Sequence, residues 1–61
     1  MKYIARIHTD GKTHDELRET KSLAQVYILS TFVNGVEVEK DKFYPPSRIV
    51  YAEIIEVKDG N

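Results

Sequence analysis

Histidine and carboxylate side chains gather in one short stretch near the N-terminus. The two histidines, His8 and His14, lie on either side of Asp10-Gly11, and further carboxylates are close by. Imidazole and carboxylate groups bind zinc and related metals where three or four of them converge on one point. In a hairpin with a two-residue turn, however, His8 faces Thr13 and His14 faces Ile7, so the two rings project from opposite faces. We therefore predict no metal site, and we interpret both histidines as exposed side chains at a hairpin tip.

Glu53 is the carboxylate best placed for acid–base chemistry, because it interrupts an apolar face that contains Tyr51 and Ile55. A carboxylate in an apolar setting has a raised pKa and can act as a general acid. A chain of 61 residues, however, has little material to enclose a pocket, and its three glycines lie too far apart to form a phosphate-binding loop. We therefore predict a non-enzyme with no catalytic residue and no cofactor. Glu53 is then interpreted as an ion-pair partner for Arg6, Arg48 or Lys2 on a neighbouring strand.

The segment from Phe43 to Arg48 is the most distinctive local sequence, because it holds both prolines of the chain. Prolines restrict the backbone in advance and so reduce the entropy lost on docking to a partner. Tyrosine and arginine are frequent hot-spot residues at protein interfaces. The predicted partner-binding residues are this loop together with two side chains of the last strand: Tyr44, Pro45, Pro46, Arg48, Tyr51 and Ile55. The alternative is that the prolines only end one element and start the next.

Nucleic-acid binding is the alternative function. Lys40, Lys42 and Arg48 lie near Tyr44, and tyrosine rings can stack on bases. Against this, three acidic residues lie in the same stretch, and nine basic against ten acidic residues give a net charge of −1. Because nucleic-acid-binding domains are usually strongly basic, we favour binding to a protein.

Length and composition place the chain among small globular domains. Its 61 residues leave room for a single domain, 1–61, and 41% hydrophobic with 31% charged residues is typical of a folded protein. The absence of cysteine excludes disulfides and is compatible with a reducing compartment. We find no membrane-spanning run and no signal peptide, so we expect a cytoplasmic protein with no membrane partner. Because domains of this size are marginally stable, self-association as a homodimer is also expected.

The first half of the chain predicts a hairpin followed by a helix. Residues 2–9 alternate as a strand, and Asp10-Gly11 favours a type I′ turn with a returning strand over 12–20. A competing interpretation takes Thr13 to Glu16 as a capping box that starts a helical turn. In the hairpin register, Arg6 lies opposite Asp15.

Ser22 and Gln25 form a second capping box, so we predict a helix with Ser22 as its N-cap. Asn34-Gly35 then ends the helix, with Gly35 in the left-handed αL conformation. The apolar stripe at helical spacing contains Leu23, Val26, Tyr27, Ser30 and Val33. The alternative is a strand over 26–33, because β-branched residues are frequent there and Asn34-Gly35 is also a hairpin signal.

The second half of the chain predicts two strands separated by a charged turn and a loop. Residues 36–39 alternate as a short strand, 39–42 form the turn, 43–47 the proline loop, 48–57 the last strand and 58–61 a frayed tail. The resulting fold class is α+β: a three- or four-stranded, mainly antiparallel sheet with one helix on one face, in β-β-α-β-β order.

Two of these strands are apolar on both faces, whereas a single helix covers only one face of a sheet. The uncovered face then exposes Tyr51 and Ile55, and exposed apolar surface often marks an interaction site. We therefore predict a small non-catalytic protein-binding module. It could act as an inhibitor or modulator of a larger macromolecule, with a protein or a second copy of the chain as its partner.

Overall fold

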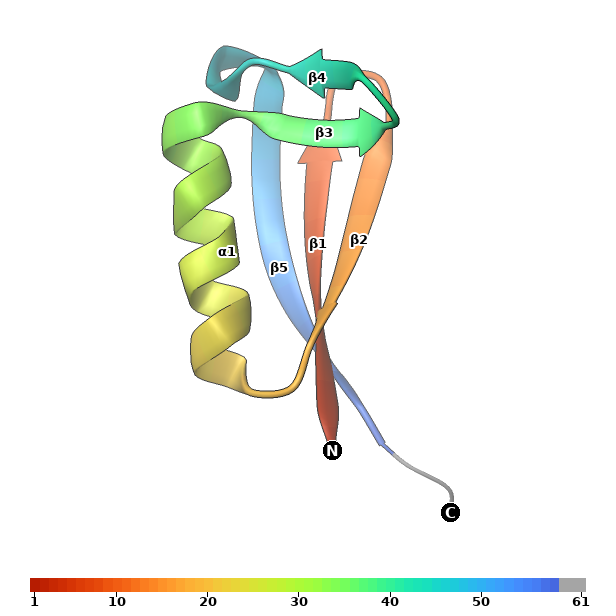
Figure 1. The fold of residues 1–61 in the computed structure, drawn as a ribbon, viewed down its shortest axis with the longest axis vertical. Coiled ribbons are helices and arrows are strands. Elements are labelled where there is room, and N and C mark those ends of the chain that lie inside the picture. The colour runs from red at the N-terminus through yellow and green to blue at the C-terminus, as the bar shows by residue number, and fades with distance from the viewer. Residues whose placement is uncertain (59–61) are drawn as a thin grey trace.

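The computed structural model describes residues 1–58 and shows an α+β fold in which one helix packs against a mainly antiparallel sheet. The elements are β1 (Lys2–Thr9), β2 (Thr13–Arg18), α1 (Lys21–Asn34), β3 (Val36–Glu39), β4 (Lys42–Tyr44), the 3₁₀ turn η1 (Pro46–Arg48) and β5 (Ile49–Val57). Three strands form one sheet in the order β2-β1-β5, and β3 and β4 form a separate two-stranded sheet across one end of it (Figure 1). The fold class and the element order predicted from the sequence are therefore confirmed.

The β1–β2 hairpin has the predicted register but not the predicted turn. Arg6 pairs with Asp15 and Ile7 with His14, so the alternative helical turn at this position is wrong. Among residues 1–58, positive φ occurs only at Gly35 and Asp41, which excludes a type I′ turn at Asp10-Gly11. The side chain of Thr9 holds the turn instead, because its Oγ1 accepts hydrogen bonds from the backbone N–H groups of Gly11 and Lys12, at 3.2 and 2.9 Å. The returning strand ends at Arg18, two residues before the predicted end.

Helix α1 starts earlier than predicted. Its N-cap is Thr20, whose Oγ1 accepts the N–H of Leu23 at 3.1 Å, and not Ser22, which lies in the first turn. The helix ends before Gly35 as predicted, and the N–H of Gly35 bonds the carbonyl of Thr31 at 2.8 Å. Gly35 has φ 87° and ψ −177°, so its φ is positive but its backbone is extended and not αL. The alternative strand over 26–33 is wrong, because this segment is helical.

The core lies between α1 and the helix-facing side of the sheet. Ala5 and Ile7 of β1 are fully buried, and they pack with the other buried apolar residues, Ala24, Ile28 and Val36. The predicted apolar stripe of the helix is therefore wrong, because Val26 and Val33 face solvent and Thr31 is buried. The hydroxyl of Thr31 is satisfied by the carbonyl of Ile28 at 2.7 Å, which lets a polar side chain occupy a core position.

The proline loop is shorter than predicted. Phe43 and Tyr44 belong to β4, which pairs with β3, and the prediction of a loop from 43 fails because only the prolines themselves are excluded from a ladder. Arg48 lies in η1, so the last strand begins at Ile49. Of the predicted tail over 58–61, residues 59–61 lie outside the described part of the chain.

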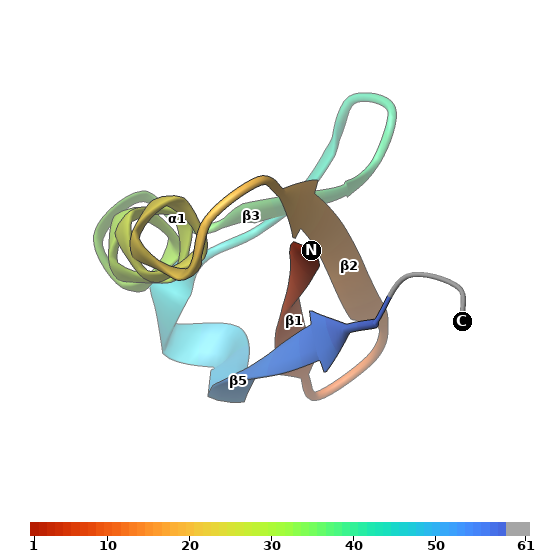
Figure 2. The ribbon, with the colours of Figure 1, turned by 90° about the horizontal axis from the view of Figure 1, so that it is seen from below.

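Strand β5 pairs only with β1 and leaves one edge of the three-stranded sheet open. Ile54 lies opposite Ala5 on the helix-facing side, and Ile55 lies opposite Ile4 on the other side. Seen from below, α1 covers one face of this sheet, and no other helix or strand of residues 1–58 covers the opposite face (Figure 2). We call this opposite face, formed by alternate residues of the three strands, the open sheet face. Within residues 1–58, no helix is both long and apolar enough to cross a membrane.

Candidate functional site

The predicted partner-binding loop is attached to the tip of the β1–β2 hairpin. The guanidinium of Arg48 donates from Nε to both carboxylate oxygens of Asp10 at 2.9 Å, and its Nη2 lies 2.8 Å from Oδ1. The same guanidinium lies 4.8 Å from the centre of the Tyr44 ring. The hydrogen bond to Asp10 raises the pKa of Arg48 above its ordinary value. Tyr44 and Arg48 thus both serve the fold, whereas Pro45 is left exposed.

A close approach at Gly11 reinforces this attachment. A Cβ atom at Gly11 would overlap the hydroxyl of Tyr44 and lie 3.2 Å from its ring carbons. The absence of a side chain at Gly11 therefore allows the tyrosine ring to lie over the turn. These contacts inside the protein hold the loop against the hairpin tip.

Tyr51 and Ile55 lie on the open sheet face, as predicted. Tyr51 is 52% exposed and stacks on His8, with ring centres 4.1 Å apart and planes inclined by 13°. Ile55 is half-buried, because it lies beside Ile4 and the adjoining Leu17 of β2. Tyr51 and Ile55 belong to β5, whereas Tyr44 and Arg48 belong to β4 and η1 and contact each other and the hairpin tip.

Ion pairs lie across the middle of the open sheet face, between its apolar residues and the stacked rings of His8 and Tyr51. Arg6 donates to both oxygens of Asp15, at 2.8 and 2.9 Å, and His8 Nε2 lies 2.7 Å from a carboxylate oxygen of Glu53. Glu53 therefore has a histidine partner where a lysine or arginine was predicted. Within residues 1–58, no group of three histidine, cysteine or carboxylate side chains is placed to hold a metal ion.

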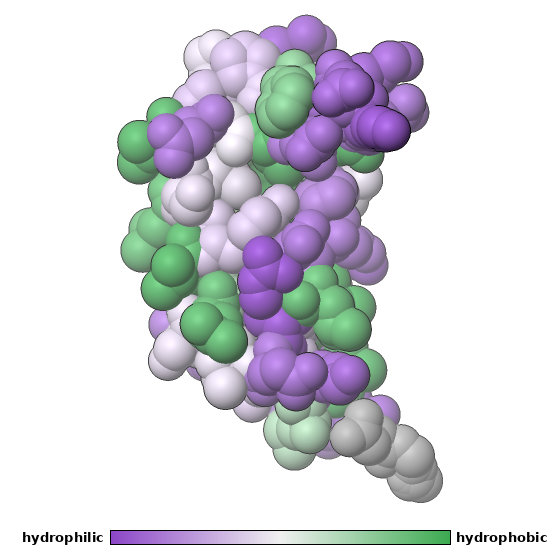
Figure 3. Space-filling view, in the orientation of Figure 1, coloured by the Kyte–Doolittle hydropathy of each residue, from purple (hydrophilic) through white to green (hydrophobic). Residues whose placement is uncertain are grey.

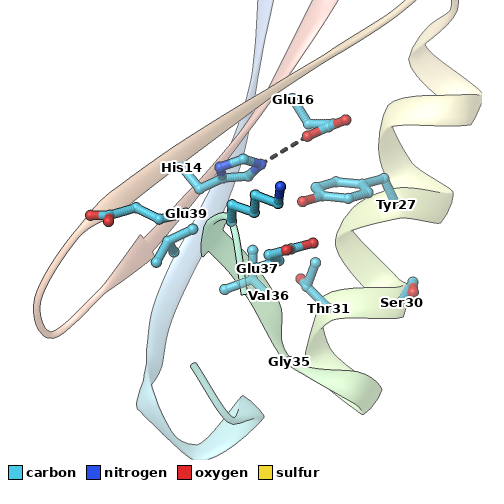
Figure 4. A pocket seen from close by; sticks show the side chains of 11 residues that line it. His14, Glu16, Tyr27, Ser30, Thr31, Gly35, Val36, Glu37 and Glu39 are labelled. Carbon is cyan, nitrogen blue, oxygen red and sulfur yellow. Dashed lines mark hydrogen bonds and ion pairs between the residues drawn. The ribbon is translucent and has the colours of Figure 1, made fainter. Parts of the chain in front are cut away.

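An open groove of about 480 Å³ lies on the other side of the sheet, between β2, α1 and β3. His14 Nε2 lies 2.8 Å from Glu16 Oε1, and Arg18 Nη1 donates to Glu16 Oε2 at 3.0 Å. Tyr27 projects from α1 toward His14 and Glu16 (Figure 4). The guanidinium of Arg18 lies 4.9 Å from the centre of the Tyr27 ring. Sequence reasoning missed this cluster, although the alternation of His14, Glu16 and Arg18 places them on one side of β2.

The surroundings of the groove favour the ionised form of Glu16 and the protonated form of Tyr27. Burial raises the pKa of Glu16, but the hydrogen bonds from His14 and Arg18 outweigh burial and leave the pKa below its ordinary value. Burial and then the nearby Glu16 charge raise the pKa of Tyr27. A general acid needs a carboxyl that holds its proton near neutral pH, so Glu16 is unsuited to that role. Glu16 instead holds Arg18, whose guanidinium lies over the Tyr27 ring and so connects β2 with α1.

Glu16 should make the stability of the protein depend on pH. Because its pKa is lower in the folded state, its stabilisation is present above its unfolded pKa and is lost as the pH falls through its folded pKa. Glu16→Gln should cost about 1 kcal/mol at neutral pH and less in acid, near pH 3, where protonation of Glu16 removes part of its stabilisation. Urea unfolding at both pH values measures this, and an equal cost at the two would contradict it.

The outward side of α1 is the surface that sequence reasoning missed. From Ser22 to Val36 the chain has no charged residue. Large apolar side chains are exposed along this side, by 63% at Val26, 62% at Leu29 and 74% at Val33. Figure 3 shows several green, hydrophobic patches along the edge of the molecule that α1 forms. We call Val26, Leu29 and Val33 the outer helix face, with Leu23 and Phe32 at its margins.

The outer helix face follows from the register of the helix in the fold. The three residues are spaced i, i+3 and i+7, which places them in one line along a helix. A helix that is apolar all round is normally buried on every side, whereas α1 buries only the side that carries Ala24 and Ile28. The sequence signal was the charge-free stretch itself, which is too apolar for a solvent-facing helix surface.

Comparisons with known proteins find no matching family model, no matching curated protein and no matching solved structure.

Proposed function

We propose that this chain is a non-catalytic protein-binding module, located in the cytoplasm, that docks through the outer helix face onto an apolar groove of a larger protein. The observation that carries the proposal is the uncharged line of Val26, Leu29 and Val33, each more than 60% exposed. Contiguous exposed apolar surface is rare on monomeric proteins unless it serves an interaction. Anchors at i, i+3 and i+7 are the pattern by which a helix binds in a hydrophobic groove.

The chemistry of the partner follows from the absence of charge. A helix side without lysine, arginine or carboxylate groups offers nothing to a charged surface, so the complementary groove is apolar. A small domain that covers part of its partner's surface can act as an inhibitor or modulator of that partner. Binding should resist high salt, because apolar burial is not screened by ions.

Nucleic-acid binding has less support from the same structure. Two of the three basic groups near the proline loop are engaged with carboxylates, since Arg48 pairs with Asp10 and Lys42 pairs with Glu39, which also pairs with Lys12. A backbone phosphate would have to displace these partners. The charge available for phosphate contacts is therefore smaller than the sequence suggests.

The test compares two variants of the chain as bait in lysate and then with the purified partner. Val26→Asp combined with Val33→Asp places two charges on the outer helix face, and both positions point to solvent, so the fold should persist by circular dichroism. We expect its dissociation constant for the partner to rise at least about 100-fold. Tyr51→Asp, which places a charge on the open sheet face, is the matched control and should bind as the unaltered chain does.

Two results would contradict the proposal. Loss of binding in Tyr51→Asp with retention in the helix variant would place the interface on the open sheet face. Loss of binding in 1 M salt would show that charge and not apolar burial holds the complex. With the purified partner, calorimetry should give a negative heat-capacity change on binding, which marks apolar burial.

A further inference from the structure

The two edges of the three-stranded sheet differ in how they are protected. The β2 edge is six residues long, contains four charged or ionisable side chains, and lies against β3. The β5 edge is nine residues long, and its only charged side chains are Glu53 and Glu56. Natural proteins shield long apolar edges with lysine, proline or a covering element, because an open edge pairs with other chains. Between Tyr51 and Val57 the β5 strand contains no lysine or proline, and within residues 1–58 no strand pairs with its free edge.

One irregularity limits which part of β5 is available. The β1–β5 ladder shifts register between His8 and Thr9, so that Tyr51 and Ile49 have partners and Val50 lies in a bulge between them. A bulge twists the strand and disrupts pairing locally. The regular edge is therefore the segment Tyr51–Val57, and the residue at its centre is Ile54.

We propose that a second copy of the chain pairs with this edge, β5 against β5, antiparallel about a two-fold axis at Ile54. The two three-stranded sheets then become one continuous sheet of six strands. Side chains that face each other across antiparallel strands share one face of the sheet, so the two-fold axis must pass through a residue position. This proposal rests on the β5 edge; its surface shares Leu29 with the outer helix face, but it does not depend on the function proposed for that face.

Charge and the length of the paired segment together select this register among the neighbouring ones. An axis at Glu53 would place that carboxylate directly opposite its own copy, which is unfavourable. An axis at Ile54 places Glu53 opposite Ile55 of the other copy and Ala52 opposite Glu56. The regular segment is then paired along its whole length, and an antiparallel ladder of this length supplies about seven backbone hydrogen bonds.

The surroundings of the edge suit a second copy. An open groove of about 650 Å³ lies between α1 and β5, lined by the apolar side chains of Ile28, Leu29, Ala52 and Ile54 together with Gln25 and the charged Lys21 and Glu53. The two-fold axis is perpendicular to the sheet, so both helices lie on the same face and turn their β5-facing sides toward each other. A specific interface usually buries about 800 Å² on each partner. The strand edge alone is narrow, so the side of α1 that lines this groove has to contribute to the contact as well.

The decisive experiment uses two substitutions at one position. Ile55→Glu and Ile55→Lys remove the same apolar side chain, but in the dimer position 55 lies opposite Glu53 of the other copy. The glutamate variant then creates two repulsive pairs and the lysine variant two attractive ones. We expect dissociation constants from sedimentation equilibrium to differ by about tenfold or more, with Ile55→Glu the weaker dimer. Unfolding by urea checks that both variants fold to a similar extent.

Cross-linking provides a second readout, because the chain has no cysteine of its own. Ile54→Cys places two thiols opposite each other on the axis, at a separation that suits a disulfide. Leu17→Cys on the β2 edge is the control. Leu17 is 51% exposed, so a thiol there can meet a second copy only by random collision. Mild oxidation should yield covalent dimer from Ile54→Cys and little from Leu17→Cys.

Three results would overturn the proposal. The first is a mass of 7.1 kDa for the unaltered chain at millimolar concentration, which means a monomer. The second is equal dimerisation of the Ile55→Glu and Ile55→Lys variants. The third is a dimer that is dissociated by Val26→Asp combined with Val33→Asp, which would place the contact on the outer helix face.

Discussion

Gly35→Ala should lower the free energy of unfolding by about 3 kcal/mol or more. Two costs combine at this position. With φ 87° and ψ −177°, Gly35 occupies a backbone region that is essentially restricted to glycine. A Cβ atom there would also overlap the carbonyl oxygen of Tyr44 and lie 3.3 Å from Cα of Pro45. Both obstacles are backbone, which cannot move aside as a flexible side chain can.

The loss matters because a domain of this size has a stability of only about 3–9 kcal/mol. Thermal and urea unfolding followed by circular dichroism should therefore show a largely destabilised protein. The adjacent Asn34→Ala is the control, since Asn34 is exposed and has a helical backbone. It should change stability by less than about 0.5 kcal/mol. Equal stabilities for the two variants would contradict the role assigned to Gly35.

Ile7→Ala should cost about 2–5 kcal/mol. The side chain of Ile7 projects from β1 into the core beneath α1 and is fully buried. Its truncation therefore loses apolar burial and leaves a cavity that the close-packed core cannot fill. Ile4 belongs to the same strand but lies on the open sheet face and is only half-buried. Ile4→Ala should cost less than half as much.

The comparison of these two isoleucines tests which face of the sheet carries the core. Urea denaturation of both variants gives the two free energies directly. A larger loss for Ile4→Ala would mean that the open sheet face is covered in solution and would contradict the assigned core.

The regular alternation of strands made the fold predictable from sequence. Arg6 opposite Asp15 and Ile7 opposite His14 follow from a two-residue turn and the two-residue period of strands. The helix face was not predictable in the same way. Since residues 22–36 contain no charge, the periodicity of α1 offers several equivalent apolar sides, and only the packing of Ala24 and Ile28 selects one.

Contacts between distant segments also lay beyond the sequence. Arg48 and Asp10 are separated by 38 residues, and nothing local to either indicates that their side chains meet. The same holds for Glu53 and His8. The predicted interface residues therefore divide between an internal attachment, at Tyr44 and Arg48, and an exposed surface at Tyr51.

The central position of β1 has a consequence for how fast the protein folds. One neighbour, β2, follows after a tight turn, whereas Val57 of the other neighbour pairs with Lys2 across almost the whole described chain. Hairpins form in about 1–10 μs, but pairings between distant segments must first overcome the entropy of closing a long loop. The rate of folding should therefore be set by the arrival of β5 on β1, in milliseconds and not microseconds. Until that step, the fully buried Ala5 and Ile7 have a β-strand neighbour on one side only.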